Sequence, residues 1–301
     1  MVLKGNVMDI SIVIPTYNNS KLLKRTLEHF VTQVRFPDAE VEMVVVNNNC
    51  QDDTDAVVKS YIGKLPLKLV AEGRQGISCA KNAGIREATG DLVIFTDDDV
   101  KPAVGWIESY WKAFRLGGAR RFWGGSIVSD HEAGVPSREI LQYAPPSVSG
   151  MNLGKCERCI NPPEYFVGAN WACPRRALNE AGVFNESLGL NPSVPSLVVG
   201  EETELMDRLR SVGYVGWYLP DATLHHFVPA AKVSLKHIAD RREGLGFYNF
   251  IGKKAPRWAY RSFLENGLKT VAYKVLGMSC VREYILFKEA KGVLRACYFK
   301  G

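Results

Sequence analysis

Residues 10–96 alternate between short apolar runs and segments whose apolar residues recur at helical spacing. The runs rich in β-branched residues lie at 10–14, 41–46, 67–71 and 92–95, and the helical segments lie near 20–34, 54–62 and 77–88. Strands separated by single helices of this length predict a mainly parallel sheet with right-handed crossovers. No GxGxxG follows the first run and no GxxxxGK[ST] occurs, so the sequence favours neither a dinucleotide-binding fold nor a P-loop.

The apolar run at 92–95 leads through Thr96 into Asp97, Asp98 and Asp99. Open α/β folds place their ligands at this carboxyl edge of the sheet. Three neighbouring carboxylates repel one another, but they suit Mg²⁺ or Mn²⁺, which takes one or two carboxylates together with water and phosphate oxygens. A solvated acidic turn is the alternative for such a triplet. We therefore predict a divalent-metal site at this edge.

The remainder of the chain differs in composition and periodicity. Residues 101–235 mix aromatic and Gly-rich runs with Pro-rich loops, whereas 236–301 is basic and has helical periodicity. Residues 231–301 contain 15 Lys and Arg against 5 Asp and Glu, while the residues before them contain 23 against 27. Since the excess positive charge lies away from the predicted metal site, we expect no nucleic-acid partner. The basic tail suits an anionic lipid surface or an acidic partner, or is simply a solvated face.

Two features bear on where the protein resides. No apolar run reaches the roughly 18 residues that a membrane-spanning helix needs, and the N-terminus has no signal-peptide pattern. The seven cysteines are odd in number and scattered, which favours reduced thiols over a disulfide framework. We expect a cytoplasmic protein, with peripheral contact to an anionic membrane through the basic tail.

Four polar segments follow predicted strands or begin predicted helices. Residues 15–19 offer small polar groups and an aromatic ring that suit a nucleobase and a ribose, and 47–54 offers side-chain amides. Residues 73–84 begin a helix after glycines and bring backbone N–H groups and Lys81 within reach of a phosphate. Residues 200–210 place two acids at the head of a helix. Ordinary turn and capping roles are the alternative for Asn and Asp clusters of this kind.

Taken in order, these segments resemble the motifs of a family 2 glycosyltransferase with the GT-A fold. The resemblance covers about residues 9–245, and its matching motifs lie at 14–18, 45–54, 76–84, 92–99, 168–170, 182–186, 200–208 and 226–229. It implies an α/β fold with a mostly parallel nucleotide-binding sheet flanked by helices, a smaller mixed sheet on the acceptor side and a helical C-terminal tail. The implied GT-A domain covers 1–235, with a nucleotide-binding half at 1–100 and an acceptor half at 101–235, and a basic helical extension follows at 236–301.

The resemblance also implies a reaction and its residues. A sugar would pass, with inversion, from a nucleotide-diphosphate donor, most simply UDP, to a hydroxyl of a glycan or lipid-linked acceptor, with Mn²⁺ or Mg²⁺ as cofactor. The residues assigned to the nucleotide are Pro15, Thr16, Tyr17, Asn18, Asn47, Asn49, Arg74, Lys81, Asp97 and Asp98. The metal is assigned to Asp99, Asp97 and His226 (with His225 as its neighbouring alternative), the base to Glu202 or secondarily Glu201, and the sugar pocket to Asn170 and Trp171.

Two positions depart from the family pattern. Asn47 stands where Asp is usual, which leaves UDP, GDP and dTDP open as donor nucleotides. Glu-Glu at 201–202 replaces Glu-Asp, so that the expected base is one methylene longer. A sugar-nucleotide nucleotidyltransferase is one alternative, although its Gly-x-Gly-Thr-Arg loop is unlike residues 15–19. A non-catalytic nucleotide- or glycan-binding protein is the other, although it would not need Glu202 beside the metal acids.

Overall fold

The computed structural model describes residues 8–32, 38–117, 120–193 and 199–298. The chain divides into two compact units. The first consists of Met1–Val128, Gly150–Ser187 and Glu201–Phe227, and the second of Ser129–Ser149, Leu188–Gly200 and Val228–Gly301. The sequence-based boundaries at residues 100 and 235 stay predictions.

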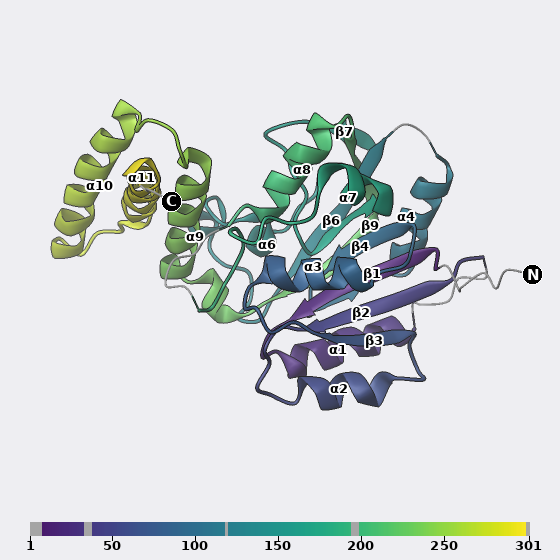
Figure 1. The fold of residues 1–301 in the computed structure, drawn as a ribbon. Helices are drawn as coiled ribbons and strands as arrows, with labels where there is room; N and C mark the ends of the chain where they lie inside the picture. The colour runs from purple at the N-terminus through teal and green to yellow at the C-terminus, as the bar shows by residue number, and fades with distance from the viewer. Residues whose placement is uncertain (1–7, 33–37, 118–119, 194–198, 299–301) are drawn as a thin grey trace, which may run out of the picture. The chain divides into compact units, whose positions relative to one another are not determined.

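The first half of the sheet is parallel, as the alternating sequence pattern predicts. Strand β1 (Ile10–Thr16) pairs on one side with β2 (Val41–Asn47), which pairs with β3 (Leu67–Ala71), and on its other side with β4 (Leu92–Thr96). Helices α1 (Ser20–Val31) and α2 (Thr54–Tyr61) cover one face, and α3 (Ile77–Glu87) covers the other (Figure 1). Because all four strands run in the same direction, the loops after β1, β2 and β4 meet at one edge of the sheet.

Strand β2 shows why continuous apolar runs form this part of the sheet. Met43 and Val45 join the core on the side of α1 and α2, while Val44 and Val46 pack with Ala80 and Ala83 of α3. A strand that is buried on both faces needs apolar residues at every position, because successive side chains point to opposite faces.

The second half of the sheet is mixed. Strand β8 (Asn170–Pro174) runs antiparallel to β4, and the order continues through β6 (Arg121–His131), β9 (Val215–Val228) and β5 (Val100–Pro102), with β7 (Arg158–Ile160) paired to β9. Helices α4 (Trp106–Arg115), α7 (Arg175–Ala181) and α8 (Glu201–Ser211) belong to the same unit. This arrangement of a parallel and a mixed half confirms the predicted GT-A type of α/β architecture.

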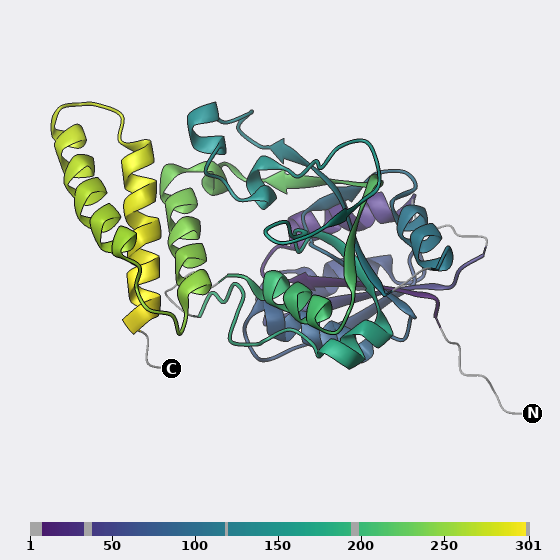
Figure 2. The same cartoon turned by 90° about the horizontal axis from the view of Figure 1, so that it is seen from above.

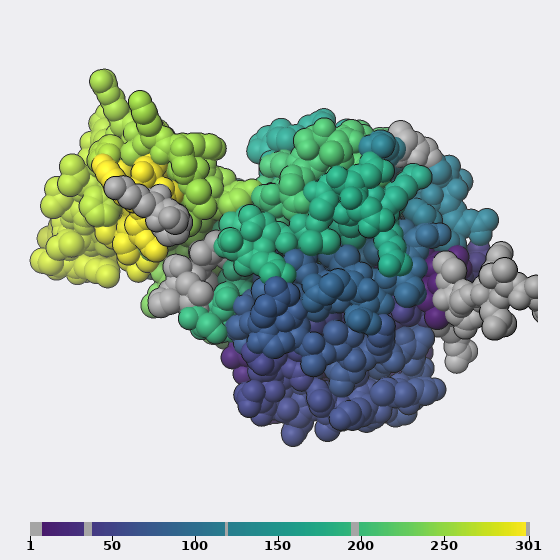
Figure 3. Space-filling view, viewed as in Figure 1, coloured from purple at the N-terminus to yellow at the C-terminus, as the bar shows by residue number. Residues whose placement is uncertain are grey.

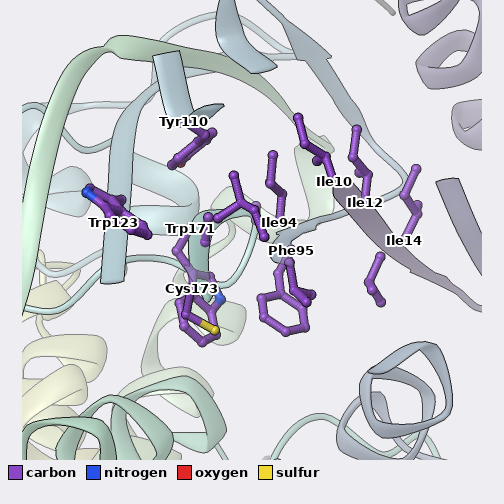
Figure 4. Packing of buried hydrophobic residues seen from close by; sticks show 14 of the residues in the cluster. Ile10, Ile12, Ile14, Ile94, Phe95, Tyr110, Trp123, Trp171 and Cys173 are labelled. Atoms are coloured by element: carbon purple, nitrogen blue, oxygen red, sulfur yellow. The ribbon is translucent and has the colours of Figure 1, made fainter. Parts of the chain in front are cut away.

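One hydrophobic core joins both halves of this sheet. Ile10, Ile12 and Ile14 of β1 belong to the same buried cluster as Trp123 and Trp171 of the mixed half (Figure 4). Phe95 stacks on Trp171, with ring centroids 4.7 Å apart. On the face shown in Figure 3, residues of the first hundred positions (purple and blue) adjoin the later teal and green residues of this unit without a break. The predicted halves therefore share one core.

The second unit contains short and long helices. The short ones are α5 (Arg138–Leu141), α6 (Pro146–Ser149) and a 3₁₀ turn at Ala230–Val233, and the long ones are α9 (Leu235–Phe250), α10 (Arg257–Val275) and α11 (Val281–Tyr298). Helix α11 packs against α9 on one side and α10 on the other (Figure 2). A Cβ added at Gly292 would lie 1.9 Å from the carbonyl oxygen of Glu243, so glycine permits the close approach of α9 and α11. The predicted helical C-terminal tail is confirmed.

No helix in the described part of the chain has the length and apolar character needed to cross a membrane.

Candidate active site

The loop after β4 connects the tips of two neighbouring strands. The Thr16 hydroxyl donates to Asp98 Oδ2 at 2.6 Å, and Asn19 Nδ2 donates to Asp98 Oδ1 at 2.7 Å. Burial is the main cause, and the charge of Asp99 the second, that raises the pKa of Asp98 to about 7. The two hydrogen bonds oppose this shift. Both carboxylate oxygens of Asp98 thus bind protein groups. The sequence placed Thr16 and Asp98 at the nucleotide, whereas the structure shows that they bind each other.

The carboxylates on either side of Asp98 meet a histidine. His226 Nε2 lies 3.1 Å from Asp99 Oδ1 and 4.0 Å from Asp97 Oδ2. Strand β5 brings these residues together, because Val100 pairs with His226 and the Phe227 amide donates to the Asp99 carbonyl. Successive side chains of a strand point to opposite faces of the sheet. His226 therefore faces the carboxylates, while His225 interacts electrostatically with His29 on the other face.

The side chains at this place suit a divalent cation. One ligand atom from each of Asp97, Asp99 and His226 lies within 4.8 Å of the others. Burial, and then the charge of Asp99, raise the pKa of Asp97, and the opposing charges of Lys81 and His226 compensate only part of this shift. Two carboxylate oxygens and an imidazole nitrogen are ligands that Mn²⁺ accepts, and Mg²⁺ accepts the carboxylates. In the described residues, this is the sole His, Cys, Asp and Glu group close enough to hold an ion.

A second charged group lies at the head of α8. Lys81 of α3 is only 1% exposed, and its Nζ lies 2.7 Å from Glu202 Oε1 and 3.6 Å from Glu201 Oε1. Burial disfavours the charged form of Lys81, but Glu202 and then Glu201 and Asp97 outweigh it and raise the lysine pKa. Lys81 therefore stays protonated and connects the acids of α8 electrostatically with those after β4.

The two glutamates are inequivalent. Burial, followed by the charge of Glu202, raises the pKa of Glu201 to about 8, so Glu201 is mainly protonated at neutral pH. Burial also opposes ionisation of Glu202, but the charge of Lys81 and hydrogen bonds hold its pKa below the usual range. The Glu202 side chain is 19% exposed and that of Glu201 is 7% exposed. Glu202 is thus the ionised and accessible member of the pair.

Gly168 is part of this arrangement. A Cβ added at Gly168 would lie 1.9 Å from Glu202 Oε1 and 3.0 Å from Lys81 Nζ, so only glycine leaves room for the ion pair. The Phe184 ring covers the other side of the ammonium group, whose nitrogen lies 5.0 Å from the ring centroid. Lys81 and Glu202, which are far apart in sequence, are thereby held in one geometry.

The loops after β1 and β2 combine exposed groups with tightly bound ones. Tyr17 is 41% exposed, and Asn18 and Asn49 are exposed residues with left-handed φ values of 48° and 65°. Asn tolerates this conformation better than most residues. Pro15 is buried, and Asn47 donates to Asp55 at 2.7 Å. Tyr17, Asn18 and Asn49 are thus exposed at the sheet edge. The Asn18 side chain also accepts from the Gln51 amide and the Asn49 side chain donates to the Gly73 carbonyl, each at 2.7 Å, so both also support the loops, as Asn47 does.

Three buried or ion-paired residues near the site were missed in the sequence: Asn48 after β2, Glu72 after β3 and Asn82 in α3. Asn48 donates to the carbonyls of Glu72 and Arg74 and accepts from the Gly76 amide at 2.9 Å, which fixes the segment that leads into α3. The Asn82 amide donates to the Phe184 carbonyl and accepts from the Phe184 N–H group. Glu72 forms an ion pair with Arg74. Both Asn48 and Asn82 lie inside the motifs that carry the family resemblance, but their partners lie too far along the chain to be read from local spacing.

Three further predicted contacts, those of Lys81, Asn170 and Trp171, require correction because their side chains are buried. Lys81 is enclosed and pairs with Glu202, so it is not placed to contact a phosphate. Trp171 is fully buried against Phe95, and Asn170 is fully buried while its amide binds Trp106, Tyr110 and two backbone carbonyls. Neither side chain reaches a surface where a sugar could contact it. Arg74 is more than half exposed, as a phosphate ligand would be, but it pairs with Glu72 and Glu186.

The fold and this site define a class: an α/β protein with an acidic, divalent-metal type of site at the carboxyl edge of a parallel sheet and a second acid pair close by. The model of Glycosyl transferase family 2 matches residues 11–172, which is more than half of the chain. The chain therefore belongs to this family, as its motifs predict.

Curated relatives agree with this assignment. A chondroitin synthase of Pasteurella multocida is 25% identical over 288 residues, which cover 85% of this chain and 28% of the relative. A hyaluronan synthase of Pasteurella multocida is 31% identical over 290 residues, which cover 85% of this chain and 28% of the relative. The glycosyltransferase AglE of Haloferax volcanii is 30% identical over 102 residues, covering 33% of each chain. The chain thus spans about a third or less of the length of these relatives.

Solved structures agree on the fold. A mannosyltransferase from Pyrobaculum calidifontis, solved with GDP-Man and Mn²⁺, aligns over 97% of this chain and 87% of its own, with a TM-score of 0.62 and 19% identity. TarS residues 1–349 of S. aureus, solved with UDP-GlcNAc, align over 89% of this chain and 73% of their own, with a TM-score of 0.55 and 17% identity. At these identities the likeness concerns the fold.

Proposed function

We propose that this protein transfers a sugar from a nucleotide-diphosphate donor to a hydroxyl of a glycan or lipid-linked acceptor, with inversion at the anomeric carbon. The observation that carries the proposal is the position of Lys81, which interacts with the acids of α8 and also with Asp97 after β4. Two acidic groups with different tasks thus lie close together in one unit.

The acids after β4 are proposed for the leaving group. Asp97, Asp99 and His226 would hold Mn²⁺ or Mg²⁺, which when bound supplies Lewis-acid neutralisation of the negative charge that develops on the departing diphosphate. Tyr17, Asn18 and Asn49 are exposed at the same sheet edge and are proposed to contact the nucleoside. Asp98, through Thr16 and Asn19, fixes the loop that carries its two neighbours.

The acids of α8 are proposed for the acceptor. Glu202 accepts the proton of the attacking hydroxyl, because it is ionised and more accessible than Glu201. Lys81 holds Glu202 in place and keeps it ionised, at the cost of lowering its basicity. Proton transfer to a positioned base is typically worth about 10²–10⁴-fold in rate. Attack on the side of the sugar opposite the diphosphate inverts the anomeric carbon.

The donor nucleotide is proposed to be UDP, supported by the UDP-GlcNAc and the UDP in the structures of TarS. GDP is the competing choice, supported by the GDP-Man in the mannosyltransferase of highest TM-score reported above. Contact of the basic tail with an anionic membrane also remains a proposal.

A donor-hydrolysis panel tests this function. Purified protein is incubated with UDP-, GDP- and dTDP-sugars and Mn²⁺, with and without glycan acceptors, and release of nucleoside diphosphate is measured. We expect release from one nucleotide class, strong dependence on the divalent cation, and loss of release in Glu202→Gln with acceptor present. Nucleotide release by none of the donors, while the protein still binds a nucleotide, would favour a binding protein instead.

A further inference from the structure

Helix α10 exposes a stripe of large apolar side chains. Leu264, Leu268, Val271 and Val275 are 63%, 73%, 64% and 80% exposed. They are spaced by four, three and four residues, so they lie above one another on a single face of the helix. Surface apolar residues are common singly, but a contiguous apolar face marks an interaction site.

The opposite face of α10 is the one that packs within the unit. Ala259 and Thr270 are buried, and Phe263 contacts Phe287 of α11 with ring centroids 4.9 Å apart. A Cβ added at Gly267 would lie 3.2 Å from the same Phe287 ring. Packing on α11 therefore fixes how α10 is rotated and directs the stripe away from α11.

Basic and aromatic residues surround the stripe. Residues 251–280 contain six Lys and Arg against one Glu, and the basic residues are all exposed: Lys253, Lys254, Arg257, Arg261, Lys269 and Lys274. Trp258 and Tyr260, at the start of α10, are 48% and 43% exposed. Trp and Tyr favour the boundary between water and lipid, since their rings are apolar and each carries one polar group.

We propose that the apolar stripe of α10, with its basic border, docks on the surface of an anionic lipid bilayer, with the helix lying in the plane of the interface. Aliphatic side chains then enter the acyl boundary while Lys and Arg meet lipid phosphates. A second copy of the chain is the less suitable occupant, because pairing two stripes would bring two strongly positive segments together. The surface is independent of the sugar-transfer chemistry proposed above.

Vesicle cosedimentation of the full chain tests this docking. The protein is mixed with phosphatidylcholine vesicles that contain either no or one-third phosphatidylglycerol. We expect binding to the anionic vesicles only, weakened by added salt. Leu264→Ser/Leu268→Ser should lower the partition coefficient at least about tenfold, because two aliphatic side chains no longer enter the bilayer. Lys253→Gln/Lys254→Gln should lower it roughly 30-fold through lost attraction to anionic lipid.

Matched controls come from the other unit. Val104→Ser/Leu116→Ser removes side chains that are 91% and 76% exposed, and Lys59→Gln/Lys112→Gln removes two exposed lysines. Both should bind vesicles as the wild-type chain does. Far-UV circular dichroism checks that every variant keeps its helices.

Two outcomes would overturn the proposal. The first is equal binding by the Leu264→Ser/Leu268→Ser variant and the wild-type chain, or no vesicle binding by either. The second is a concentration-dependent dimer that the same variant abolishes while vesicles are ignored, which would make a second copy the occupant. Because the readout is sedimentation, either outcome leaves the donor-hydrolysis test of the proposed function unaffected.

Discussion

Two carboxylate clusters in this protein have opposite surroundings. In the sheet unit, Asp97 and Asp99 lie side by side with His226, and burial and mutual repulsion raise the pKa of Asp97. In the helical unit, Glu243 of α9 is also buried, but Lys288, Lys291 and Arg295 of α11 all pair with it. Burial opposes ionisation of Glu243, yet hydrogen bonds from Lys288 and Arg295 outweigh it and lower its pKa.

The difference separates a site that can receive a cation from one that is already neutralised. Three basic side chains complete the cluster around Glu243, so its role is to hold α9 against α11. The acids after β4 have one histidine for two carboxylates, which leaves negative charge for a ligand to neutralise. Perturbed pKa values alone would flag both clusters. The sign of the shift and the identity of the partners distinguish them.

The largest effect is expected from Asp99→Asn. The substitution keeps the side-chain shape and removes one metal ligand, so donor turnover should fall roughly 10³-fold as several kcal/mol of charge stabilisation are lost. Nucleoside-diphosphate release at saturating Mn²⁺ measures the change. The exposed acid Asp91 provides the control, and Asp91→Asn should release nucleoside diphosphate at the wild-type rate. Full activity of Asp99→Asn without added metal would remove the distinction between the two clusters.

Lys81→Met is expected to have the next largest effect, about 10²-fold in kcat, since it leaves the proposed base without its positioning partner. Lys81 lowers the pKa of Glu202, so its removal raises that pKa and moves the acidic limb of the pH–rate profile to higher pH. Lys81→Arg should restore part of the rate. Lys68→Met, which breaks the exposed pair of Lys68 with Glu87, is the control. An unshifted acidic limb in Lys81→Met would exclude Glu202 as the titrating base.

Glu243→Gln tests the second cluster. Lys288 would keep Asp240 as a partner, but Lys291 and Arg295 would lose the carboxylate that they share with it. The helical unit should lose about 2 kcal/mol of stability, somewhat less than a fully buried ion pair because Lys291 and Arg295 are half exposed. Hydrogen–deuterium exchange of α9 and α11 in the full chain reports this loss. Glu265→Gln, in an exposed pair with Arg261, should change exchange little. Equal effects of the two substitutions would show that the cluster around Glu243 does not hold the helices together.

The smallest effect is expected from acidic pH. Asp240 and Glu243 have lowered pKa values, so the stability they contribute is complete above the unfolded-state pKa and is lost as pH falls through the folded one. Asp97 and Asp98 have raised pKa values, so protonation relieves repulsion after β4 as pH falls. Segment-resolved exchange between pH 7 and 2.5, corrected for intrinsic rates, should show α11 loosening below about pH 4 while the loop after β4 does not. Parallel loosening of both segments would contradict the comparison.

The sequence predicted the sheet unit well because its signals are local. Runs such as 67–71, and the Asp triplet after 92–95, identify strands and their carboxyl ends without knowledge of any partner. The helical unit was predicted in type only. Its first segment, 129–149, joins the C-terminal helices through contacts between distant parts of the chain, which no local pattern reveals.

The errors within the site have the same cause. Lys81 follows glycines at the start of a helix, which is typical of a phosphate site, but its partner Glu202 lies 121 positions further along the chain. Trp171 is a large aromatic side chain that could serve equally as a sugar platform or as core, and only its stacking on Phe95 decides. Residue type and spacing therefore predicted the acids after the fourth strand, and the family resemblance added His226, while long-range packing determined which neighbouring side chains are enclosed.

The most direct measurement is the anomalous scattering of manganese in crystals grown or soaked with Mn²⁺ and UDP or GDP. The proposed mechanism predicts a peak within coordination distance of Asp97, Asp99 and His226, with the nucleotide's diphosphate beside it and Glu202 facing the sugar side. A bound nucleotide with no peak at these three residues would contradict it.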